Sequence, residues 1–220
     1  RQVDRIEDAA LVFYLGQDFQ PGIERAAERA TGTAVDLLDA DLGLIPGDPH
    51  FWLDPTLLKK AVERVTAAYV EYDRARATGY EERSAAYVRE LDELDTAYRE
   101  GLRTCDRRLI VTSHAAFGYL ARQYGLTQKA VAGLSPESEP EAGQLAALAR
   151  EVRAEGVTTI FSETLVSPRV AETLAREAGV GTSVLNPLEG LTEEEAAAGE
   201  TYSSVMRENL AALRAALGCR

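Results

Sequence analysis

Short apolar runs alternate along this chain with longer stretches of helical spacing, and this alternation constrains the fold more than any other feature. The runs are rich in β-branched, aromatic and leucine residues, which is typical of buried strands. They lie at residues 11–15, 33–38, 109–112, 129–132, 159–161 and 183–185. Strands separated by helices favour parallel sheets. We therefore predict an α/β fold with parallel β-sheets flanked by helices.

The middle of the chain breaks this alternation. After Asp54-Pro55, a typical helix start, apolar residues recur at helical spacing with charged residues between them and without a strand pattern. Two sheets joined by a long helical segment would produce such a sequence. The predicted parts are an incomplete N-terminal lobe at residues 1–75, a linking helix at 76–103 and a C-terminal lobe at 104–220.

Charge and hydropathy narrow the function. The 220 residues carry a net charge of −12, and an acidic surface repels a phosphate backbone, so we predict no nucleic-acid partner. No apolar run approaches the roughly 20 residues that a membrane helix requires, and no secretory signal pattern is present. The chain opens at Arg1 in what resembles the middle of a helix. We therefore expect a preceding segment, which would carry any export signal.

The two cysteines, Cys105 and Cys219, leave two interpretations open. They are either unrelated thiols, one of them near the C-terminus, or a disulfide that ties the C-terminus to a lobe. A disulfide would require an oxidising compartment. Their spacing alone does not decide between the two.

The chain has two histidines, His50 and His114, and each lies where a loop or strand leads into a predicted helix. In open α/β sheets such positions bind ligands. The positive end of a helix disfavours a protonated imidazole, and the neutral imidazole is the form that binds metal. Apolar neighbours, Trp52 among them, would exclude water. Against a metal site, a histidine beside aromatic residues is more often an ordinary hydrogen-bonded residue, and a separation of 64 positions matches no short zinc motif.

Two further side chains follow predicted strands. Glu163 comes directly after residues 159–161 and Ser162, and Asn186 comes directly after residues 183–185. In a parallel sheet both would lie at the carboxyl ends of neighbouring strands. A solvated loop acid is an equally good interpretation of Glu163. An asparagine carbonyl is a weak ligand for zinc and a better one for harder cations.

Five segments of the chain resemble one known family, the zinc and manganese solute-binding proteins of bacterial ABC transporters. The strongest similarity lies in Asp-Pro-His-Phe-Trp-Leu-Asp-Pro at 48–55 and in Ser-His-Ala-Ala-Phe-Gly-Tyr at 113–119. The others are Leu-Ser-Pro-Glu at 134–137, Phe-Ser-Glu at 161–163 and Val-Leu-Asn-Pro-Leu at 184–188. The resemblance covers essentially the whole chain, and together these motifs are highly specific.

The resemblance implies two lobes bridged by a long rigid helix, with a metal ion in the cleft between the lobes. It implies that His50 and His114 are metal ligands, and it places Glu163 where manganese-type members have a glutamate ligand. Asn186 is a departure, because the family usually has aspartate there. The family's first histidine ligand lies in an N-terminal segment that we expect to precede Arg1. Members are exported, which favours the disulfide interpretation of the two cysteines.

On this resemblance we predict an extracytoplasmic receptor, monomeric and lipid-anchored in its precursor, that captures Zn²⁺ or Mn²⁺ and delivers it to an ABC permease in the membrane. Its predicted metal ligands are His50, His114, Glu163 and Asn186, and we predict no enzymatic activity. One alternative is a zinc hydrolase with water at an open metal position, but no residue is an obvious general base. The other is a surface adhesin of the same family, for which the sequence has no discriminating feature.

Overall fold

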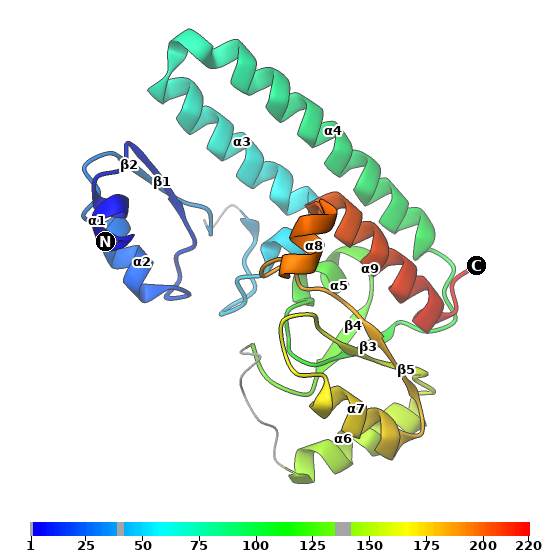
Figure 1. Cartoon of the computed structure of the whole chain (residues 1–220). Coiled ribbons are helices and arrows are strands. Elements are labelled where there is room, and N and C mark those ends of the chain that lie inside the picture. The colour runs from blue at the N-terminus through cyan, green and yellow to red at the C-terminus, as the bar shows by residue number, and fades with distance from the viewer. Residues whose placement is uncertain (1, 39–41, 135–141) are drawn as a thin grey trace. The chain divides into compact units, whose positions relative to one another are not determined.

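The computed structural model describes residues 2–38, 42–134 and 142–220 and divides the chain into two compact units, Arg1–Glu93 and Leu94–Arg220 (Figure 1). Each unit contains parallel strands flanked by helices, so the predicted α/β class is confirmed. The three-part division with a separate linking helix stays a prediction. Most of the family motif at 134–137 lies outside the described residues.

Unit 1 contains a two-stranded parallel sheet and a long helical segment. Leu11 of β1 lies opposite Thr33 of β2. The predicted helix start after Asp54 is confirmed, because the Asp54 carboxylate accepts the N–H of Thr56 at 2.9 Å. The elements are α1 (Gln2–Glu7), β1 (Leu11–Tyr14), α2 (Pro21–Ala27), β2 (Thr33–Asp36), the 3₁₀ turn η2 (Phe51–Leu53), α3 (Pro55–Tyr72), the 3₁₀ turn η3 (Arg74–Arg76) and the larger part of α4 (Ala77–Gly101).

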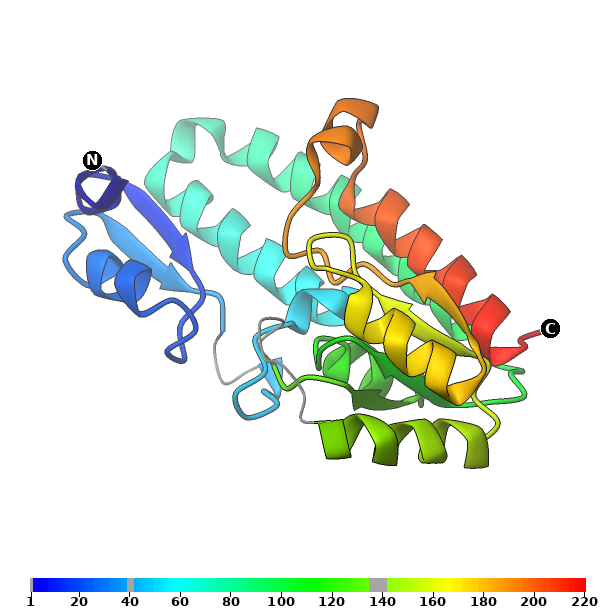
Figure 2. The same ribbon diagram turned by 60° about the horizontal axis from the view of Figure 1, so that its bottom comes forward.

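Unit 2 is built on a parallel sheet with the strand order β4-β3-β5-β6. Helices α6 and α7 lie side by side on one face of this sheet, and α5 and α9 lie on the other (Figures 1 and 2). Besides the end of α4, the elements are β3 (Leu109–Thr112), α5 (Gly118–Tyr124), β4 (Thr127–Ala130), α6 (Ala142–Ala154), β5 (Thr159–Ser162), α7 (Arg169–Ala178), β6 (Gly181–Val184), α8 (Glu193–Ala198) and α9 (Tyr202–Leu217).

The core of unit 2 lies between the sheet and the pair α6 and α7. Val111 of β3 and Ile160 of β5 are fully buried there against apolar residues of both helices, such as Val152 and Leu174. The central strands are buried on both faces, as their continuous apolar sequence predicts. This packing makes the carboxyl ends of β3 and β5 a rigid platform.

Helix α9 packs along the end of α4. The Tyr98 hydroxyl of α4 donates to the carbonyl oxygen of Met206 at 2.7 Å, and Tyr98 is fully buried. Gly101 permits close approach, because a Cβ at this position would lie 3.2 Å from the side chain of Leu210. None of the helices in the described ranges is both long and apolar enough to cross a membrane.

Two strands begin before the apolar run that predicts them. β4 spans Thr127–Ala130 rather than 129–132, and β6 spans Gly181–Val184 rather than 183–185. Pairing with the neighbouring strands sets these limits, since Thr127 lies opposite Leu109 and Gly181 lies opposite Thr159. Polar residues and glycine at a strand start produce no apolar signal, so the sequence did not reveal them.

Cys105 and Cys219 form a disulfide, with a Cα–Cα distance of 3.8 Å across 114 positions. The disulfide interpretation is therefore confirmed. The Arg220 N–H also donates to the Thr104 carbonyl oxygen, so the last residues are joined to the segment just after α4 through backbone and side chain. The disulfide closes residues 105–219 of unit 2 into one covalent loop.

We expect the double variant Cys105→Ala/Cys219→Ala to unfold with a free energy up to about 4–5 kcal/mol lower, because the crosslink limits the entropy of the unfolded chain. Urea unfolding followed by circular dichroism measures this. Reduction of the unaltered protein is the matched control and should produce the same loss. Equal urea midpoints with and without the crosslink would contradict the expectation.

Candidate metal site in unit 2

His114 stands just beyond the carboxyl end of β3, at the point where the strand order reverses. The chain passes from β3 to β4 on one side and then to β5 on the other, so β3 and β5 flank a topological switch point, where α/β sheets bind ligands. The backbone is held here by Thr112, whose hydroxyl donates to the His114 carbonyl oxygen at 2.6 Å. The Gln128 amide donates to the same oxygen at 3.0 Å. His114 is therefore fixed by its own strand and by β4.

Glu163 follows β5 and holds the imidazole of His114. Its Oε1 lies 2.7 Å from Nδ1 of His114 and accepts the His114 backbone N–H at 3.1 Å. Both side chains are almost completely buried. A carboxylate on Nδ1 keeps the proton on that nitrogen and so makes Nε2 the lone-pair donor of the neutral ring. The structure thus brings together two of the predicted residues, His114 and Glu163.

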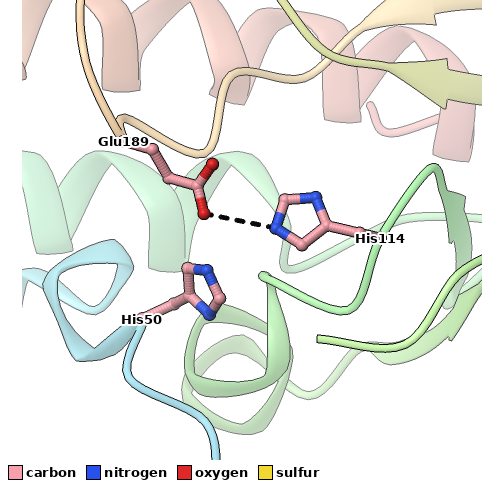
Figure 3. Close-up of side chains that lie close together, drawn as sticks. All are labelled: His50, His114 and Glu189. Atoms are coloured by element: carbon pink, nitrogen blue, oxygen red, sulfur yellow. Dashed lines mark ion pairs between the residues drawn. The ribbon is translucent and has the colours of Figure 1, made fainter. Parts of the chain in front are cut away.

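Glu189 lies on the other side of the same imidazole, and the sequence interpretation missed it. Its Oε1 is 3.5 Å from Nε2 of His114, and Figure 3 shows the two side chains pointing toward one another. The Glu189 side chain is 26% exposed, whereas that of His114 is fully buried. The only sequence signal is its place directly after the family motif at 184–188. Among 36 acidic residues a single exposed glutamate does not stand out.

The two carboxylates decide the charge of His114. Burial lowers the pKa of His114, but the hydrogen bonds and the charges of Glu163 and Glu189 outweigh burial and raise the pKa to about 9. A carboxylate beside the lone pair of a neutral Nε2 would be repelled unless a cation lies there. In the metal-free protein this cation is a proton on Nε2. A divalent metal ion bound to Nε2 would take the place of that proton. The side chains around Nε2 therefore fit a cation.

Asn186 is buried just beyond β6, but its side chain already has protein partners. Its amide donates to Glu195 at 3.1 Å, and its carbonyl oxygen accepts the N–H of Leu188 at 2.8 Å. Both groups therefore act within the loop that leads to Glu189.

His50 belongs to unit 1, and its surroundings repeat the arrangement around His114. The Oδ1 atom of Asp48 lies 2.7 Å from Nδ1 of His50 and also accepts the His50 backbone N–H at 2.9 Å. Both residues are buried, and the ring of Trp52 lies 5.1 Å from that of His50. The carboxylate again makes Nε2 the lone-pair donor. The motif at 48–55 therefore orients the His50 imidazole in the way that a metal ligand requires.

Two α/β units, each with a buried histidine oriented by a carboxylate, fit the class of metal-binding receptors. The chain belongs to the family "Zinc-uptake complex component A periplasmic", whose model matches residues 1–216. This family consists of solute-binding proteins of metal ABC transporters rather than enzymes.

Individual relatives agree with this membership. The chain is 39% identical, over 97% of its length, to the zinc-binding lipoprotein AdcA of Streptococcus pneumoniae strain R6. It is 44% identical, over 77% of its length, to the high-affinity zinc uptake system protein ZnuA of Bacillus subtilis. The chain spans about half the length of these two relatives, 47% and 53% respectively.

A solved structure extends the similarity to the fold. The Zn(II)-bound ZnuA-like domain of S. pneumoniae AdcA superimposes with a TM-score of 0.85 at 39% identity. The superposition covers 98% of this chain and 82% of that one.

We expect Glu163→Gln to lower the pKa of His114 in the metal-free protein, since one of the two charges that raise it is removed. A proton NMR titration measures this pKa, and with two histidines in the chain a His50→Gln variant assigns the signals. Glu193→Gln, which removes an exposed acid of α8, is the control and should leave the value near 9.

The same pKa shift predicts how stability depends on pH. The pKa of His114 in the folded protein lies above its ordinary value of 6.5. The stabilisation that the protonated imidazole gives the folded protein is therefore complete below pH 6.5 and is lost as the pH rises to about 9. Metal-free protein should therefore lose stability over this range, and Glu163→Gln should lose less of it. Identical pH profiles for the two proteins would contradict this account.

Proposed function

We propose that this protein binds Zn²⁺ outside the cytoplasm and delivers the ion, chemically unchanged, to an ABC permease in the membrane. The observation that carries the proposal is the buried imidazole of His114, held through Nδ1 by Glu163 and facing the carboxylate of Glu189 through Nε2. That arrangement favours a cation at Nε2. Membership in a family of zinc-uptake components supports zinc as the cation.

In this proposal His114 and Glu189 of unit 2 are ligands, and His50, which Asp48 orients within unit 1, is a further ligand, as the family resemblance implies. Two imidazoles and one carboxylate are a common zinc set, to which a further ligand adds to complete a tetrahedron. Asp48 and Glu163 receive a different role, since each occupies the Nδ1 side of one histidine. They orient the rings and raise the basicity of Nε2.

Two residues predicted as ligands thus receive other functions here. We propose that Glu163 acts through His114 and that Asn186 shapes the loop before Glu189. The short Glu163–His114 distance supports the first assignment, and the two hydrogen bonds of the Asn186 side chain support the second.

We propose zinc rather than manganese as the physiological ion. Imidazole nitrogen suits zinc, whereas manganese prefers sites made largely of oxygen ligands. The relatives with the printed names AdcA and ZnuA are described as zinc-binding or zinc-uptake proteins. The disulfide between Cys105 and Cys219 supports an oxidising, extracytoplasmic location. A monomer with a lipid anchor in the precursor completes the proposal.

We expect His114→Ala, His50→Ala and Glu189→Ala each to weaken Zn²⁺ binding by about 100-fold or more. Loss of a direct ligand should exceed the 10- to 100-fold loss that follows removal of a residue that only orients one. Competition with a zinc chelator of known affinity measures the change. Glu193→Ala is the matched control for Glu189→Ala, because it removes an exposed acid from the same region of the chain. Unchanged affinity in His114→Ala would end the claim for that residue.

We also expect Zn²⁺ to raise the stability of the folded protein. Free ion at about 100 times the dissociation constant stabilises by about 2.7 kcal/mol when the unfolded chain does not bind it. Thermal unfolding with added Zn²⁺, and again after removal by EDTA, measures this shift. Mn²⁺ at the same concentration should produce a smaller shift, and an equal or larger shift would favour manganese. His114→Ala should reduce the Zn²⁺ response to about 0.4 kcal/mol or less under the same conditions, because its affinity is expected to be about 100-fold weaker or more.

A further inference from the structure

The side chain of Asn209 in α9 forms hydrogen bonds with both the backbone N–H and the backbone carbonyl of Asn186. Its side-chain oxygen accepts the Asn186 N–H at 2.8 Å, and its side-chain amide donates to the Asn186 carbonyl oxygen at 2.7 Å. Both residues are buried, with exposed fractions of 3% and 5%. Because the buried Asn209 side chain satisfies both the backbone N–H and the backbone carbonyl of Asn186, it fixes Asn186 to helix α9.

Asn186 in turn determines the path of the chain toward Glu189. Its side-chain oxygen accepts the N–H of Leu188 at 2.8 Å, which closes a tight turn. Leu188 has φ of 56°, a left-handed conformation that leucine rarely adopts and that persists only where surrounding contacts impose it. Glu189 is the next residue. The direction in which its carboxylate leaves the chain therefore depends on the turn at Asn186.

Glu195 supports the same turn from its other end. One carboxylate oxygen accepts the Asn186 amide at 3.1 Å, and the other accepts the Thr192 N–H at 2.7 Å. Thr192 and Glu195 form a capping box at the start of α8. The loop between Asn186 and α8 is thus held at both ends, although Glu189 itself is exposed to solvent on one side.

We infer that Asn209 is a positioning residue for metal binding, which acts by holding the turn that directs Glu189 toward Nε2 of His114. This inference rests on the proposed zinc-binding function. An exposed glutamate pays conformational entropy when it binds an ion, and a turn fixed by buried hydrogen bonds reduces that cost. Asn209 lies 20 positions beyond Glu189 and on another element, so no local motif indicates the connection.

The test is a double-mutant cycle with Asn209→Ala and Glu189→Ala, with Zn²⁺ as the probe and chelator competition as the measurement. Asn209→Ala removes both hydrogen bonds to Asn186 without a change of charge. We expect it to weaken Zn²⁺ binding about tenfold or more in the otherwise unaltered chain. In the Glu189→Ala background the same substitution should change the affinity by less than about twofold, because the side chain that it positions is gone.

Ser203→Ala is the matched control, since Ser203 is another buried polar residue of the same helix. It should leave Zn²⁺ affinity unchanged in both backgrounds. If Asn209→Ala instead weakened Zn²⁺ binding by disturbing the packing of α9, Ser203→Ala would also weaken binding, or the loss from Asn209→Ala would remain in the Glu189→Ala background. Equal losses from Asn209→Ala with and without Glu189, or no loss at all in a folded variant, would overturn the inference.

Thermal unfolding of the metal-free variants shows whether Asn209→Ala is folded. If it is not, the same cycle with Glu195→Gln replaces it, because Glu195 is half-exposed and supports the same turn. If the effects of Glu195→Gln and Glu189→Ala on Zn²⁺ affinity were independent in that cycle, the inference would equally be overturned. The proposed function fails separately, in the case where Glu189→Ala and His114→Ala themselves leave Zn²⁺ affinity unchanged.

Discussion

The contact on which the site in unit 2 depends is that between Nδ1 of the buried His114 and the carboxylate of Glu163. It joins the ends of the two central strands, β3 and β5, and determines which ring nitrogen carries the proton. With Nδ1 protonated, Nε2 presents a lone pair toward the carboxylate of Glu189. Such a pairing is favourable only with a cation at Nε2, so the two carboxylates together explain both the raised pKa of His114 and the proposed affinity for a metal ion.

The rest of unit 2 keeps this arrangement rigid. The sheet core fixes the strand ends, Thr112 and Gln128 fix the His114 backbone, and the disulfide ties the C-terminus to the end of α4. Glu189 differs from the other groups, because it is partly exposed and lies on a loop held by Asn186 and Asn209. Under the proposed function the protein must release its ion as well as bind it. A rigid histidine opposite a glutamate on a separately held loop is compatible with both requirements.

The sequence carried clear signals for the fold and for the histidines. Alternating apolar runs indicated parallel α/β structure, and the two segments around His50 and His114 indicated a metal-receptor family to which the chain belongs. It carried weaker signals for the carboxylates. Glu163 was predicted at the carboxyl end of a strand, and it does follow β5, but its contact with Nδ1 of His114 depends on the register of β3 and β5. Glu189 was missed, since one exposed acid among 36 has no distinguishing pattern.

The amino-acid sequence by itself therefore determined the class of fold, the start of α3 and the family, because these depend on local periodicity, local hydrogen bonds and contiguous motifs. Only the tertiary structure decided the pairing of Cys105 with Cys219 and the support of the Glu189 loop by Asn209. Both are contacts between residues distant in sequence. Their formation depends on how helices pack on a sheet, and no short-range pattern records that packing.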